Sequence, residues 1–220
     1  MSSARTGEMS WRFRGVMLAA YVAWGTALGV GFAKLWRYTY TPGVEAVAPP
    51  SWPQSARLQR GIDRPTLVLI VSPGCPCSQA TVRELARVVA RAPARAAIRM
   101  IFDVSDAGDA GDAGVGHVAP QESRLWRMAN AIPGVVTVVD RDGSETAAFG
   151  AHVSGQAFLY DEAGHLLFRG GITAARGHGG DNDGADSLVA LLTGGVAPRE
   201  RTAVFGCALE QTPSRDEVTP

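Results

Sequence analysis

Beyond residue 65, the hydrophobic residues of the chain follow two different patterns. Short runs of consecutive apolar residues are typical of buried strands, and they alternate with stretches whose apolar residues recur every three or four positions, as on one face of a helix. The first run, Thr66–Val71, precedes such a helical stretch, Gln79–Arg91. The pattern predicts strands at 66–71, 97–104, 135–139, 156–160 and 165–169, and helices at 79–91, 121–131, 144–149 and near 186–192.

The order of these elements also predicts how the strands pair. Strands that are connected through a helix must run parallel, whereas a tight turn joins two antiparallel strands. Such a turn is predicted at 161–164, where Gly164 occupies the position that requires a positive φ. The fold class is therefore α/β, with a mixed sheet that is parallel in its first half and antiparallel in its second.

A longer apolar run lies near the N-terminus. No residue from Val16 to Ala33 is charged, and a helix of that length extends roughly 27 Å, close to the thickness of a bilayer's hydrocarbon core. Arginines precede the run and aromatic residues flank it on both sides, as expected at a membrane interface. We expect a cytoplasmic N-terminus at 1–15 and an uncleaved, single-pass transmembrane helix at 16–33. A signal peptide cleaved after Gly31-Phe32-Ala33 is the alternative.

Composition bounds the rest of the chain. The 21 basic and 21 acidic residues cancel, so no overall field favours nucleic acid, and no nucleic-acid partner is expected. The proline-rich segment 34–64 is predicted to be a stalk, 65–195 the folded domain and 196–220 a polar tail. The Asp-Ala-Gly repeats between Asp106 and Gly116 indicate a solvated loop rather than a cation site.

The candidate chemistry lies in the run Ser72-Pro73-Gly74-Cys75-Pro76-Cys77-Ser78, between the first strand and the first helix. A helix that begins there directs its free N–H groups and the positive end of its dipole toward the sulfurs, which stabilises thiolate, the reactive form. Cys75 and Cys77 are therefore candidate catalytic residues for thiol–disulfide exchange. We expect Cys75 to be the nucleophile and Cys77 the resolving thiol, with the reverse order open. A disulfide between them closes a small ring across Pro76, and its strain favours easy reduction.

Cys207 is the third cysteine, and three interpretations of it stay open. It pairs with Cys75 or Cys77, completes a metal site, or packs as a small apolar residue. Soft thiolates select Cu(I) on the oxidising side of a membrane. The alternative to a cofactor-free redox protein is therefore a copper-binding or copper-delivering protein, with ligands from Cys75, Cys77, Cys207 and His152.

The strand, cysteine turn and helix at 71–79, together with the strand–turn–strand at 158–166, resemble those of thioredoxin-fold proteins, in particular their membrane-anchored, extracytoplasmic thiol–disulfide branch. Cys75–Ser78, Gly170–Thr173 and Phe205–Cys207 are also similar to a bacterial thioredoxin-like group labelled RedB. The resemblance covers about 65–192. It implies a three-layer fold around a central mixed sheet, protein thiols or disulfides as partners, and a single-pass protein of the bacterial inner membrane whose domain faces the periplasm.

The chain departs from that family at two places. Family members place two residues between their cysteines, whereas here only Pro76 intervenes, and Gly74 then stands where the nucleophile is usual. Where the family has a cis-proline facing the active site, this chain has Ser154-Gly155. The predicted substrate groove therefore consists of Pro76, Ser154 and Gly155. The missing proline favours metal binding, and it leaves open a non-catalytic binding module on a thioredoxin scaffold.

Overall fold

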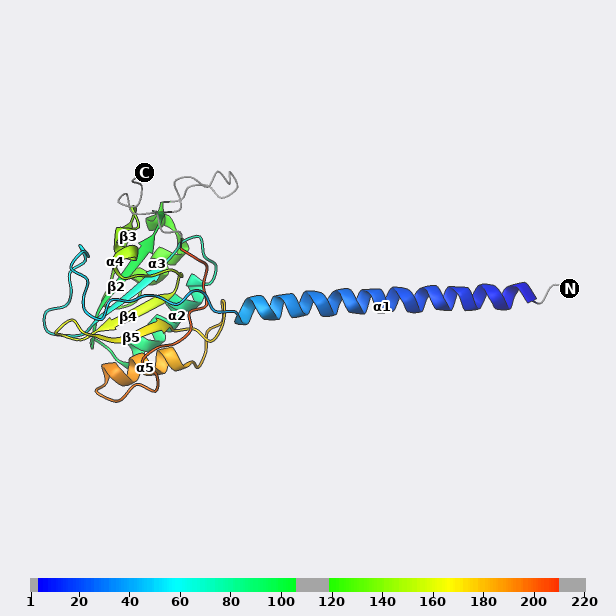
Figure 1. Ribbon diagram of the computed structural model, residues 1–220. Coiled ribbons are helices and arrows are strands. Elements are labelled where there is room, and N and C mark those ends of the chain that lie inside the picture. The colour runs from blue at the N-terminus through cyan, green and yellow to red at the C-terminus, as the bar shows by residue number, and fades with distance from the viewer. Residues whose placement is uncertain (1–3, 106–118, 210–220) are drawn as a thin grey trace, which may run out of the picture. The chain divides into compact units, whose positions relative to one another are not determined.

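The computed structural model describes residues 4–105 and 119–209, and the chain divides after Tyr40 into a helix and a folded domain. The Asp-Ala-Gly repeat region 106–116 and the last part of the predicted tail, 210–220, lie outside the described residues. Helix α1 runs from Ala4 to Tyr40 (Figure 1). It continues beyond the predicted anchor at 16–33, since apolar and aromatic residues follow and the first proline comes only at Pro42.

Helix α1 contains a candidate membrane span. In the part of the chain that the structure describes, Phe13–Tyr40 is the one stretch that is long and apolar enough to cross a bilayer. A signal sequence near the N-terminus meets the same criterion. The stretch is thus compatible with a single membrane span and with a signal sequence.

The domain contains one five-stranded mixed sheet, in the order β3-β2-β1-β4-β5. Its strands β1 and β2 run parallel, as do β2 and β3, whereas β4 is antiparallel to both β1 and β5. The predicted sheet, parallel in its first half and antiparallel in its second, is therefore confirmed. The strands are β1 (Thr66–Val71), β2 (Ala97–Asp103), β3 (Val135–Asp140), β4 (Gln156–Tyr160) and β5 (Leu166–Gly171).

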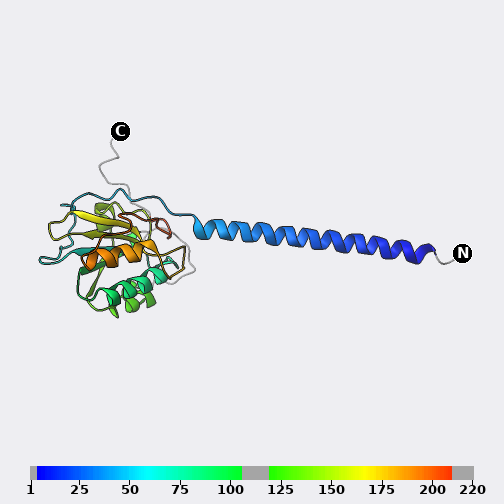
Figure 2. The ribbon, with the colours of Figure 1, turned by 90° about the horizontal axis from the view of Figure 1, so that it is seen from below.

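Helices cover both faces of this sheet. One face carries α2 (Ser78–Arg91), α3 (Arg124–Asn130) and α5 (Asp183–Leu192), and Figure 2 shows α2 and α5 side by side. The other face carries the short α4 (Ser144–Ala148). Helix α3 is shorter than predicted because Ser123 caps it, accepting a hydrogen bond from Trp126 N–H, while Pro120–Glu122 form a separate 3₁₀ turn, η2.

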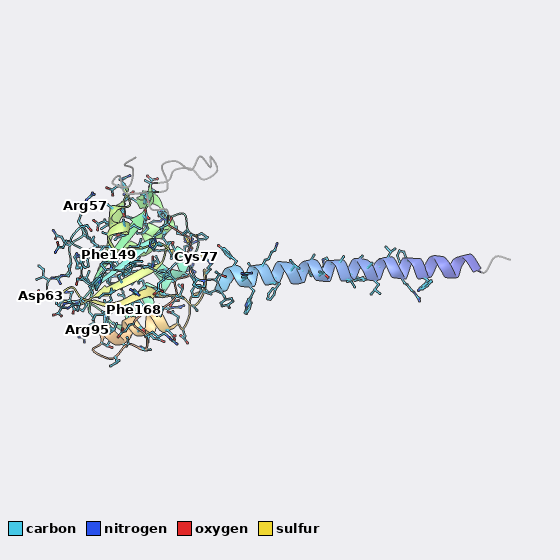
Figure 3. The ribbon with its side chains drawn as sticks, viewed as in Figure 1. Arg57, Asp63, Cys77, Arg95, Phe149 and Phe168 are labelled. Atoms are coloured by element: carbon cyan, nitrogen blue, oxygen red, sulfur yellow. The ribbon has the colours of Figure 1, made fainter. Side chains whose placement is uncertain are left out.

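Two apolar clusters hold the layers together. The cluster beneath α2, α3 and α5 includes Leu85, Phe168 and Leu188, all essentially inaccessible to solvent. The second cluster, on the opposite face, includes Phe149 and Tyr160; Figure 3 labels Phe149 and Phe168, one from each cluster. Burial on both faces gives the three-layer α/β arrangement.

The segment 41–58, predicted as part of a free stalk, instead packs on the domain. Ala46 and Ala48 are buried in the second cluster, and Trp52 lies edge-on to Tyr160 with a ring-centroid distance of 5.3 Å. Backbone hydrogen bonds fix the segment, including Trp52 N–H to the carbonyl of Gly164 at 2.7 Å. The physical reason is that α4, with five residues, is too short to cover the apolar second face. A proline-rich strand-like segment covers the remainder with few N–H groups to satisfy.

Candidate thiol site

The cysteine run forms a hydrogen-bonded turn between β1 and α2. Cys75 N–H donates to the carbonyl of Ser72 at 3.2 Å, and Ser78 N–H donates to the carbonyl of Cys75 at 3.1 Å. Pro76 is exposed and follows Cys75, at a position of the turn that its fixed φ suits. Cys77 directly precedes α2, as Figure 3 shows. Both cysteines therefore lie at the N-terminal end of this helix, as the sequence predicts.

The loop before β4 borders this turn. The Ser154 hydroxyl accepts a hydrogen bond from Ser72 N–H at 2.9 Å and lies 3.0 Å from the Ser78 hydroxyl. Gly155 has φ +98°, a conformation that suits glycine, and its N–H donates to the carbonyl of Ile70 at 2.7 Å. Ser154 and Gly155 are thus adjacent to the cysteine turn, which is where the sequence predicts the groove. The Ser154 side chain thus holds the loop before β4 against the cysteine turn.

Cys207 joins the two other thiols from a distant part of the chain. Its N–H donates to the sulfur of Cys75 at 3.3 Å. The segment around it runs antiparallel to residues 152–154, with Ser154 N–H donating to the carbonyl of Cys207 and Leu209 N–H to that of His152, both at 2.9 Å. Of the three interpretations of Cys207, proximity to Cys75 supports pairing.

The surroundings give the three thiols different acidities. Burial acts to raise the pKa of Cys75, but hydrogen bonds from Cys207, Cys77 and Ser78 together outweigh it, so the pKa lies below that of an ordinary thiol. Burial and the negative charge of Cys75 raise the pKa of Cys77. Burial and the hydrogen bond to Cys75 raise the pKa of Cys207 to about 12. Cys75 is therefore the thiol that ionises first.

Arg176 is a neighbour of the thiols that the sequence reasoning did not identify. It lies in the loop after β5, and its Nη1 donates to the carbonyl of Gly206. Its positive charge lowers the pKa of both Cys77 and Cys207, although other effects dominate there. The glycine-rich loop 170–184 is the only local signal, and it does not indicate that this cation faces the cysteines.

A copper site receives less support from the geometry. Within residues 4–105 and 119–209, no group of three or more His, Cys, Asp or Glu side chains is arranged to hold a metal ion. His152 is half-buried, and its hydrogen bonds with Gln156 and Leu209 run through its backbone. Copper binding, with Cys75, Cys77, Cys207 and His152 as the predicted ligands, stays a prediction.

The strand order, the helix after β1 and the cysteine turn at its start define a thioredoxin-like fold. No protein-family model matches the chain, and no curated protein sequence is similar to it.

Among solved structures, the chain is similar to an uncharacterized conserved protein from Geobacillus kaustophilus, with TM-score 0.53, 16% identity and coverage of 80% of this chain and 96% of that chain. It is also similar to a hypothetical protein from Sinorhizobium meliloti, with TM-score 0.53, 22% identity and coverage of 79% and 96%. A secreted disulfide oxidoreductase of Mycobacterium tuberculosis aligns with TM-score 0.42 and 14% identity over 59% of this chain and 84% of its own. At these identities the likeness concerns the fold alone.

Proposed function

We propose that this protein is a membrane-anchored, extracytoplasmic thioredoxin-like protein that exchanges thiols and disulfides with partner proteins through Cys75. The observation that carries the proposal is the hydrogen bonding from Cys207 to the Cys75 sulfur, at the N-terminal end of α2. These donors and the helix dipole stabilise a thiolate, and thiolate is the nucleophile in exchange. The narrower resemblance to the RedB group stays a prediction.

The exchange proceeds in two displacements. The Cys75 thiolate attacks one sulfur of a partner disulfide, which forms a mixed disulfide and releases the partner's other sulfur as a thiolate. A second thiol, that of Cys77 or Cys207, then attacks the Cys75 sulfur and displaces the partner's first sulfur. The protein ends with an internal disulfide and the partner with two reduced sulfurs. The same steps in reverse oxidise a partner dithiol.

The location of the protein is part of the proposal. We place α1 in the bacterial inner membrane as an uncleaved single-pass anchor, with the domain in the periplasm, where disulfides persist. Pro76 is exposed beside the cysteines, whereas Ser154 and Gly155 are buried; a substrate groove made of these three residues stays a prediction. Protein thiols or disulfides are the proposed partners.

A redox titration of the full-length protein in detergent micelles tests the proposal. Thiols are counted after equilibration with reduced and oxidised glutathione, and Cu(I) retention is measured in parallel after dialysis. We expect a reversible two-electron transition that Cys75→Ser abolishes and that Arg83→Ala, on the exposed side of α2, leaves unchanged. The absence of a transition, or stoichiometric copper that both Cys75→Ser and Cys77→Ser lose, contradicts the proposal.

A further inference from the structure

Cys75 has two possible partners for an internal disulfide, and they differ in how the backbone holds them. Cys77 belongs to the same turn as Cys75, whereas Cys207 comes from a segment 132 positions further along the chain. Both are close to Cys75, because Cys77 and Cys207 each hydrogen-bond with the Cys75 thiol. The chain therefore contains three thiols for a reaction that needs two.

Cys77 is constrained by the start of α2. Its carbonyl accepts Ala80 N–H at 3.0 Å, and the Cys75 carbonyl accepts Ser78 N–H at 3.1 Å. Pro76, between the two cysteines, has a fixed φ. A Cys75–Cys77 disulfide must close its small ring within this hydrogen-bonded turn, so the ring relaxes only at the expense of the turn.

Cys207 has no such restriction. Two backbone hydrogen bonds hold the segment Val204–Leu209 in place. Ser154 N–H donates to the carbonyl of Cys207, and Leu209 N–H donates to the carbonyl of His152. Gly206 fits closely beside Ser154: a Cβ added there would lie 1.8 Å from the Ser154 carbonyl oxygen. The segment therefore holds the Cys207 thiol beside Cys75 without placing a strained small ring between them.

We propose that Cys207, rather than Cys77, is the resolving thiol, and that the internal disulfide of the oxidised protein links Cys75 to Cys207. This inference rests on the proposed exchange function. In the first step, the Cys75 thiolate forms a mixed disulfide with a partner protein and a partner thiolate leaves. In the second, Cys207 passes its proton to the released thiolate and attacks the Cys75 sulfur. The Cys75–Cys207 bond forms, the mixed disulfide breaks, and the second partner sulfur leaves as thiolate.

The charges around Cys207 favour this order of steps, because they change when Cys75 reacts. While Cys75 is a thiolate, its charge and its hydrogen bond help to keep Cys207 protonated. Formation of the mixed disulfide removes that negative charge, whereas the positive charge of Arg176 stays and favours ionisation of Cys207. Cys207 thus becomes nucleophilic after Cys75 has reacted.

Peptide mapping of the oxidised full-length protein, in detergent micelles, tests the pairing. The protein is oxidised with glutathione disulfide, alkylated in acid-quenched samples and digested with trypsin without reduction. Cys75 and Cys77 lie on one tryptic peptide and Cys207 on another, so a Cys75–Cys207 bond joins two peptides. We expect the joined pair in the wild type and in Cys77→Ser. A single peptide with an internal Cys75–Cys77 bond as the main wild-type product overturns the inference.

The glutathione adduct on Cys75 provides a second readout. We expect it to accumulate at least roughly tenfold more in Cys207→Ser than in Cys77→Ser, because only the former lacks the resolving thiol. Gly206→Ala displaces the segment while keeping the thiol and should also accumulate adduct, whereas Ala208→Ser, on an exposed position of the same segment, should not. Equal or greater accumulation in Cys77→Ser overturns the inference. If Cys75 reacts with glutathione disulfide in no variant, the exchange function itself fails.

Discussion

Cys75 is only 3% exposed, yet its pKa is lower than that of an ordinary thiol. Burial alone has the opposite effect, because it disfavours the charged form. Hydrogen bonds from Cys207, Cys77 and Ser78 reverse it, and those from Cys207 come first among them; its N–H lies 3.3 Å from the Cys75 sulfur. A residue far along the chain therefore contributes to the acidity of Cys75.

Removal of Cys207 should accordingly make Cys75 less acidic. In Cys207→Ala the burial of Cys75 persists but the side-chain donor is lost, so its pKa rises. The pH profile of iodoacetamide labelling, quantified on the Cys75 peptide by mass spectrometry, should have its midpoint at higher pH than in the wild type. Ala208→Ser serves as the control. A midpoint that stays in place would mean that Cys207 does not stabilise the thiolate.

The sequence predicts where the cysteine turn lies, but it does not predict that Cys207 hydrogen-bonds to the Cys75 sulfur. The apolar strand before Cys75 and the amphipathic stretch after Cys77 are local patterns, so the position of both thiols at a helix start is predictable. The contacts of Cys207 and Arg176 arise from pairing between segments separated by many residues. Such contacts leave no periodic signal in a single sequence, which is why the sequence alone leaves the interpretation of Cys207 open and does not indicate Arg176.

At the level of elements, α2 connects the cysteine turn to the core. Its buried face includes Val82, Leu85 and Val89, spaced as one side of a helix, and packs on the sheet beside α5. The same spacing makes this helix predictable within one residue. Helix α5 begins at Asp183, three residues before the predicted start near 186, because Asn182 caps it by accepting Ala185 N–H.

Truncation within this buried face should destabilise the domain. Leu85 is fully buried, so Leu85→Ala is expected to lower the free energy of unfolding by about 2–5 kcal/mol through lost burial and a residual cavity. Arg83→Ala, on the exposed side of the same helix, should change it by less than about 0.5 kcal/mol. Guanidinium unfolding followed by tryptophan fluorescence measures both, and similar values for the two variants would contradict the packing.

The segment 41–58 offers a second test at this level. Trp52 packs against Phe149 and Tyr160, with ring-centroid distances of 5.2 and 5.3 Å. Trp52→Ala should therefore cost about 2 kcal/mol or more in the free energy of unfolding, whereas Val47→Ala, 79% exposed in the same segment, should cost little. Thermal unfolding followed by circular dichroism gives the comparison. If Trp52→Ala behaves like Val47→Ala, the segment is not part of the folded domain.

For the whole molecule, the sequence predicts which strands run parallel and which antiparallel, but it misjudges what covers the sheet. Strand order along the chain and the turn at Gly164 determine which pairs run parallel. The prolines of the segment 41–58 suggest a stalk, since proline content is read as a linker signal. The segment packs on the domain instead, because the short α4 leaves part of the apolar second face uncovered. That uncovered face exists only once the sheet has assembled, so the local sequence does not reveal it.

The predicted anchor is tested on the intact protein from bacterial membranes. We expect an N-terminus upstream of Val16 by mass spectrometry, and retention in the membrane pellet after alkaline carbonate extraction, because the apolar stretch of α1 stays in the bilayer. A mature N-terminus directly after Ala33, with the protein released into the soluble fraction, would show a cleaved signal peptide instead.

The most direct test of Cys75 as an exchange nucleophile is its reaction with a defined disulfide. The reduced full-length protein in detergent micelles is mixed at neutral pH with a self-quenched fluorescent peptide disulfide, and the second-order rate constant is measured. A thiolate stabilised as described should react at least roughly tenfold faster than a free cysteine peptide, and Cys75→Ser should abolish the gain. A wild-type rate equal to that of the free peptide, or a fast rate retained in Cys75→Ser, would contradict the account.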